Sequence, residues 1–171
     1  MADGFVHLYQ TGWSRARAAL RITSLGLTGA ALANPATGKI HTGEWDDRDS
    51  QDFKYWLDAD TDIFCTVRRV TPDVVVEEFS LDGFGGPWCE PGQDRVIHLV
   101  LSQLRETGSS AVGLVADRRG SSLATDVDGI VLGGPTPVTV LPELLILEPG
   151  AADRHPEPAD WGRRPGSGSN S

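Results

Sequence analysis

The apolar residues of this chain occur in short runs separated by turn-forming residues, and this pattern restricts the fold more than any other feature. The runs from Asp62 to Val70 and from Val74 to Leu81 are rich in Val, Phe, Ile and Thr, and Thr71-Pro72-Asp73 lies between them. β-Branched and aromatic residues favour strands, while Pro and Asp favour the turn that joins two of them. The sequence therefore predicts a β-hairpin over residues 62–81.

Residues 93–107 carry the clearest helical pattern of the chain. Their apolar side chains recur at the spacing of one helical face, at Val96, Ile97, Val100, Leu101 and Leu104. Gly108 follows at the position where glycine commonly ends a helix. Further helices are expected from Ser14 to about Ser24 and, as a short segment, over 51–57.

The remaining apolar runs predict further strands. They cover residues 5–10, 27–33, 39–42, 111–116, 129–132 and 138–141. The apolar segment 141–147 fits either type of element. Together these elements predict an α+β fold, with a mixed, mostly antiparallel sheet and two or three helices packed on one face.

The length of 171 residues is typical of one domain. Residues 149–171 contain four prolines and four glycines but no Ile, Leu, Val or Phe. Such a segment buries too little apolar surface to offset the entropy that it loses on ordering. We expect a single globular domain over 1–148 and a disordered Pro/Gly/Ser-rich tail over 149–171.

The chain is acidic, with a net charge of −9. This charge argues against nucleic acid and anionic membranes as partners, because both require clustered Lys and Arg. No secretory signal and no membrane-spanning run is apparent, so a cytoplasmic location is expected. The strong preference for Arg over Lys is typical of a GC-rich bacterial genome.

Cys65 lies in an apolar run and is expected to be a buried thiol, although pairing with Cys89 stays open.

The sequence contains none of the common short catalytic motifs. The sequence has no phosphate-binding loop and no Gly-x-Ser-x-Gly elbow. Asp58, Asp60 and Asp62 resemble the start of a calcium loop, but Ile63 and Arg69 stand where such a loop requires Gly and Glu. We therefore expect no catalytic residues, no cofactor and no metal site, and the sequence leans away from an enzyme.

Negative charge is concentrated in residues 44–62. This segment holds eight acidic and two basic residues, a net −6 of the chain's −9, with aromatic residues interleaved. Trp and Tyr often anchor interfaces, and clustered carboxylates steer basic partners. The aromatics can instead pack inward while the acids face water, and both interpretations stay open. The candidate partner-binding residues are Glu44, Trp45, Asp46, Asp47, Asp49, Trp56, Asp58 and Asp60.

The leading hypothesis is a non-catalytic protein-binding module of a bacterial cytoplasm, either an immunity-protein-like inhibitor or an adaptor, that binds a basic protein through this acidic-aromatic surface. One alternative is a small enzyme or ligand-binding domain with a site near the loop 82–94. A second alternative is a structural subunit of a larger assembly. The oligomeric state stays open.

Overall fold

The computed structural model describes residues 4–14, 16–17, 28–33, 40–41, 50–56, 61–82, 89–107, 110–134 and 140–148. Most of the helix predicted from Ser14 to Ser24 and the whole of the predicted tail lie outside these residues.

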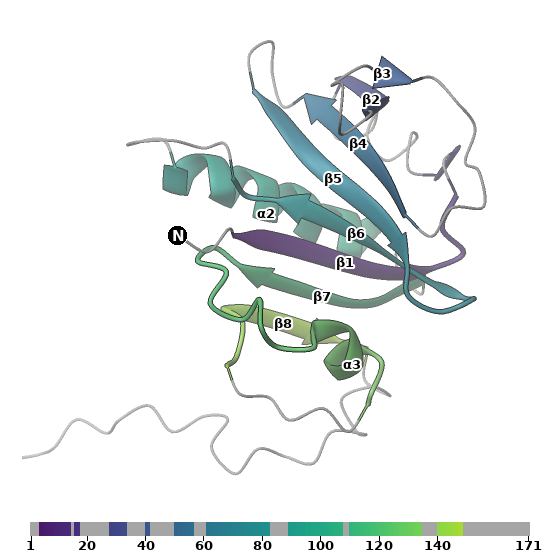
Figure 1. Cartoon of the computed structure of the whole chain (residues 1–171), viewed down its shortest axis with the longest axis vertical. Helices are drawn as coiled ribbons and strands as arrows, with labels where there is room; N and C mark the ends of the chain where they lie inside the picture. The colour runs from purple at the N-terminus through teal and green to yellow at the C-terminus, as the bar shows by residue number, and fades with distance from the viewer. Residues whose placement is uncertain are drawn as a thin grey trace, which may run out of the picture.

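The described strands form one eight-stranded sheet in the order β3-β2-β4-β5-β6-β1-β7-β8 (Figure 1). All of the pairings between these strands are antiparallel. The strands are β1 (Phe5–Thr11), β2 (Thr28–Ala33), β3 (Ile40–His41), β4 (Ser50–Trp56), β5 (Asp62–Arg69), β6 (Val74–Ser80), β7 (Ala111–Asp117) and β8 (Leu144–Leu147).

Most of the predicted strands are confirmed, including the hairpin of β5 and β6. The short helix predicted over 51–57 is wrong, because these residues belong to β4. Phe53 is 2% exposed whereas its neighbours Asp52 and Lys54 are only half-buried, as in a strand with one face in the core. β4 pairs with both β2 and β5, and this pairing outweighs the local helical spacing.

The strand predicted over 129–132 is also wrong, since this region forms the short helix α3 (Val127–Val131). The Asp126 side chain accepts a hydrogen bond of 2.9 Å from the Gly129 backbone N–H and so caps the helix. Of the strand predicted over 138–141, only Val140 and Leu141 are described, and neither lies in a strand.

The long helix α2 (Cys89–Thr107) covers one face of the sheet. Its buried residues Val96, Ile97 and Val100 pack into a core with side chains from the central strands. β1 contributes Val6 and Leu8 to this core, and β5 contributes Ile63, Cys65 and Val67. Cys65 is therefore buried, as expected.

The short helix α3 packs on the opposite face. Val127 and Val131 lie in a second cluster with Phe5, Tyr9 and Val115, side chains that alternate with those facing α2. The α+β class holds, but packing of two or three helices on one face is not confirmed, because the described helices α2 and α3 lie on opposite faces. None of the described helices has both the length and the hydropathy required to cross a membrane.

Asp117 at the end of β7 organises the turn that leads toward α3. Its fully buried carboxylate accepts hydrogen bonds from the Ser122 hydroxyl at 2.7 Å, the Ser122 N–H at 2.8 Å and the Ser121 hydroxyl at 3.0 Å. Burial alone would raise the pKa of Asp117, but these hydrogen bonds outweigh it and hold the pKa below its usual value. Asp117 is therefore an ionised structural anchor.

Candidate functional site

The face of β4 and β5 that points away from α2 is largely polar and charged. Phe53, Ile63, Cys65 and Val67 point into the α2 core, so the residues between them point to the other side. α3 packs against the β6 side of this face, while no helix in the described residues covers β4 or the adjoining part of β5 (Figure 1). We call this surface the open sheet face and define it by Asp52, Lys54, Asp62, Phe64, Thr66, Arg68 and Glu78.

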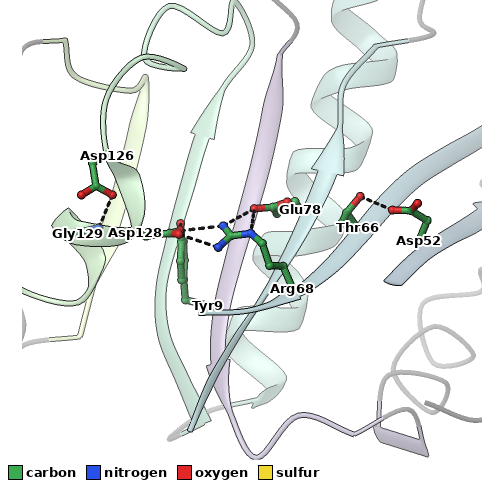
Figure 2. Close-up of polar contacts among 8 residues, drawn as sticks. All are labelled: Tyr9, Asp52, Thr66, Arg68, Glu78, Asp126, Asp128 and Gly129. Atoms are coloured by element: carbon green, nitrogen blue, oxygen red, sulfur yellow. Dashed lines mark hydrogen bonds and ion pairs between the residues drawn. The ribbon is translucent and has the colours of Figure 1, made fainter. Parts of the chain in front are cut away.

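Phe64 is the large apolar residue of the open sheet face. Its exposed fraction is 36%, and it lies directly opposite Lys54 of β4. Lys54 forms an ion pair with Asp62, and both side chains are more than a third exposed. Thr66 follows Phe64 on the same side of β5 and donates a hydrogen bond of 2.8 Å to Asp52 (Figure 2). An accessible aromatic ring therefore lies among charged and polar groups.

Arg68 links the open sheet face to α3. Its Nε and Nη2 atoms donate to Glu78 Oε1 at 3.0 and 2.6 Å, and its Nη1 atom donates to Asp128 Oδ2 at 2.8 Å. Tyr9 donates its hydroxyl proton to Asp128 Oδ1 at 2.6 Å. Figure 2 shows the four side chains converging from β1, β5, β6 and α3. We call Tyr9, Arg68, Glu78 and Asp128 the α3 clamp.

The protonation states of the α3 clamp are fixed by its surroundings. Burial and the bond to Asp128 raise the pKa of Tyr9, so the phenol keeps its proton. Burial alone would raise the pKa of Asp128, but the bonds from Arg68 and Tyr9 outweigh it and lower the pKa. Asp128 is therefore an ionised acceptor and Tyr9 a neutral donor. This arrangement suits a structural junction better than a proton-transfer site.

His7 lies next to the clamp on β1. Its ring centroid is 4.4 Å from that of Phe5 and 6.3 Å from that of Tyr9, and it stands opposite Glu78 in the sheet. Burial lowers the pKa of His7 to about 4, and the nearby Asp128 only partly opposes this effect. Its Nδ1 atom is buried and has no hydrogen-bond partner among the described residues. His7 is therefore a neutral, half-buried histidine at neutral pH.

A separate cavity of about 420 Å³ opens beside the start of α2. Arg118 bonds Asp94 through Nε at 3.1 Å and Glu143 through Nη1 at 3.0 Å. The side chains of Glu90 and Arg119 have no hydrogen-bond or ion-pair partner among the described residues. The cavity is lined by Glu90, Gln93, Asp94, Arg118, Arg119 and Glu143.

Most of the residues predicted to bind a partner lie outside the described part of the chain. These are Glu44, Trp45, Asp46, Asp47, Asp49, Asp58 and Asp60. Trp56 is the last residue of β4, where it pairs with Asp62 and Thr28, and the structure does not describe its side chain. Two other acids of the segment 44–62, Asp52 and Asp62, lie on the open sheet face.

Sequence reasoning missed Phe64, Arg68 and Asp128. The alternation of β5 carries a signal for Phe64, because Ile63, Cys65 and Val67 are the apolar set and Phe64 falls on the other side. No local signal brings Arg68 to Asp128, since these residues are 60 positions apart in the sequence.

The described residues contain no group of three His, Cys, Asp or Glu side chains that could hold a metal ion. Comparisons with protein-family models, with curated proteins and with solved structures found no match.

Proposed function

We propose that this chain is a non-catalytic protein-binding module of a bacterial cytoplasm, an immunity-protein-like inhibitor or an adaptor, that binds a basic protein. The observation that carries the proposal is Phe64, which is 36% exposed beside β4, where no described helix covers the sheet. A half-exposed aromatic ring inside a charged rim has the composition of a small interface, where the ring supplies buried area and the rim excludes water.

The charge around Phe64 supports a basic partner. Asp62 and Asp52 border the ring, and their segment, 44–62, holds a net −6 of the chain's −9. Carboxylates in such number accelerate the encounter with a positively charged surface and disfavour acidic competitors. In an inhibitor they would occupy the positions that phosphates or acidic substrates take on the partner.

The state of the described ionisable groups supports binding over catalysis. Tyr9, Asp128 and Arg68 satisfy one another, and Asp117 is held by its own turn. Groups with fixed protonation states and saturated hydrogen bonds are poor general acids or bases. They are well suited to keep a sheet rigid while its surface binds.

Charge reversal at matched positions tests the proposal. The probe is an arginine-rich peptide, and its affinity is measured by calorimetry at low and at moderate salt. The double variant Asp46→Lys, Asp47→Lys is expected to weaken binding of the peptide more than the control does. The expected difference in affinity is at least about tenfold, which corresponds to roughly 1.4 kcal/mol. The control is Asp73→Lys with Glu148→Lys, which makes the same change of net charge at exposed positions away from the segment 44–62.

Binding to the unaltered chain is expected to fall as salt rises, because exposed charges are screened. Equal losses in the two double variants would mean that the peptide reads only the net charge, and the proposal would then fail.

A ligand-binding role near the loop 82–94 is the second candidate function. The cavity beside the start of α2 favours it, because about 420 Å³ is ample for a small molecule. Glu90 and Arg119 offer opposite charges there, with no partner among the described residues, and this pair suits a small zwitterion. The cavity is lined by charged groups rather than by the apolar surface that most ligand pockets offer, so it ranks second.

A further inference from the structure

The strand β8 ends the sheet on the side opposite to β3. It pairs with β7 and with no other described strand, and it lies at the outer border of the sheet in Figure 1. None of the residues from Leu144 to Leu147 has a hydrogen bond beyond that pairing. One row of backbone N–H and C=O groups of β8 is therefore without a partner among the residues that the structure describes.

The pairing with β7 shows which groups belong to this row. The Glu148 N–H donates to Val112 O at 3.0 Å, so these two residues form a hydrogen-bonded pair. In an antiparallel ladder, hydrogen-bonded and non-hydrogen-bonded pairs alternate. Ile146 and Leu144 therefore also point their backbone groups toward β7. Leu145 and Leu147 point theirs outward.

β8 is short, and Glu143 and Glu148 flank it, but its four residues carry no further device that protects an exposed strand. Natural edge strands carry charged residues, Pro or bulges that prevent pairing with another chain. The sequence Leu-Leu-Ile-Leu has none of these, and all four side chains are only half-buried. Val140 and Leu141, which precede the strand closely, are 44% and 47% exposed. The edge is therefore both apolar and open for hydrogen bonding.

We infer that two copies of this chain pair through β8 and form a dimer with one continuous antiparallel sheet. Outward groups can bond only to outward groups, and the register that sets Leu145 of one copy opposite Leu147 of the other lets both outward residues of each copy exchange their backbone hydrogen bonds. The twofold axis then passes through Ile146. This register places Glu148 opposite Leu144 of the second copy, and it never sets Glu148 against Glu143 across the seam. Like charges are thus kept from directly opposed positions.

A second copy fits this edge better than the basic protein proposed above. The four residues of β8 carry no charge, so a basic partner gains no electrostatic attraction from them. An identical strand buries no unpaired charge and offers equal numbers of donors and acceptors. Closed twofold pairing also removes the exposed β8 edge. Twofold symmetry is the commonest symmetry of soluble oligomers.

Sedimentation velocity of the full chain, over a range of concentrations, tests the dimer. We expect a species of about twice the 18.3 kDa of the chain, and its share should rise with salt because two molecules of charge −9 repel each other. This direction is opposite to the salt effect expected for a basic partner, so failure of the dimer and failure of the proposed function are distinguishable. A monomer at all concentrations and salt levels would overturn the inference.

Matched variants locate the seam. Leu145→Pro removes an outward N–H without touching the ladder to β7 and should give a monomer. Phe64→Lys, on the open sheet face, should leave the dimer intact. A dimer that survives Leu145→Pro would show that the contact lies elsewhere.

Amide hydrogen exchange provides a test that needs no substitution. In the dimer the N–H groups of Leu145 and Leu147 should exchange slowly, and dilution should make them fast. Those of Leu144 and Ile146 should stay slow at both concentrations, because they are bonded to β7. Fast exchange of Leu145 and Leu147 at high concentration would contradict pairing through β8.

Discussion

Single side chains set the chemical character of the sheet faces. Arg68 reaches Glu78 on β6 and Asp128 on α3, so one guanidinium joins elements that are far apart in the sequence. Both contacts are charge-assisted hydrogen bonds, which stabilise more than neutral ones do. His7 and Tyr9 fill the space beside this ion pair, and their burial keeps them neutral. The sheet between β5 and α3 is therefore held by polar contacts that are specific in geometry and resistant to titration near neutral pH.

His7 makes the stability of the fold dependent on pH in a defined window. Its pKa is about 4 in the folded chain, below the usual 6.5 of a histidine side chain, so the folded state favours the neutral ring. Its stabilising effect is complete above about pH 6.5 and is lost as the pH falls toward 4, at up to about 1.4 kcal/mol per pH unit. The lowered pKa values of Asp117 and Asp128 act at lower pH, below the usual carboxylate range.

Urea unfolding between pH 7 and pH 4 measures this effect. We expect His7→Gln to flatten the decline of unfolding free energy between pH 6.5 and 4, while His98→Gln, which removes an exposed histidine from α2, leaves the decline in place. If the unfolding free energy of both variants declines with pH as steeply as that of the unaltered chain, His7 is not the group that causes the decline.

Among the elements, α3 is the one that depends most on its neighbours. A helix of five residues does not form by itself in water, because one turn costs more entropy than its hydrogen bonds return. Three contacts hold α3 in place: the Asp126 cap, the clamp through Asp128, and the packing of Val131 over Gly113. The last of these requires glycine, since a Cβ at residue 113 would lie 2.9 Å from Val131 Cγ1 and 3.1 Å from Ile146 O.

Gly113→Ala should therefore lower the free energy of unfolding by about 1–3 kcal/mol, the usual effect of an added methyl group in a packed site. Gly92→Ala inside α2 is the matched control, and there the higher helix propensity of Ala should raise stability by up to about 1 kcal/mol. Thermal or urea unfolding of both variants measures these changes in the free energy of unfolding. A Gly113→Ala chain as stable as the unaltered one would mean that α3 does not pack on β7 as described.

The elements also show how far sequence patterns predict this fold. β5, β6 and α2 follow directly from alternation and from a helical stripe, because each buries one face over many residues. β4 is different, since Phe53, Trp56 and Leu57 have helical spacing and only pairing with β2 and β5 makes this segment a strand. α3 is too short to show any period. The open sheet face depends on register between strands, which no local pattern contains, and so Phe64 emerged only from the structure.

At the scale of the whole molecule, the sheet has two regions of different character. The region of β4 and β5 carries Phe64 with Asp52 and Asp62, and these two acids belong to the most acidic segment of the chain. The β8 end is uncharged and apolar, with unpaired backbone groups. A dimer through β8 would place the two open sheet faces on opposite sides of the seam, with β1 and β7 between each face and β8. Each copy would then be available to its own basic partner.

The most direct test of the central claim is site-specific photo-crosslinking in cells of the source organism. Phe64 is replaced by p-benzoylphenylalanine, and the same replacement at Leu123, which is 53% exposed outside the open sheet face, is the control. The account predicts that position 64, and not position 123, crosslinks to one protein with a net positive charge, and that Asp46→Lys with Asp47→Lys abolishes the adduct. Crosslinking at neither position, or the same products from both, would contradict it.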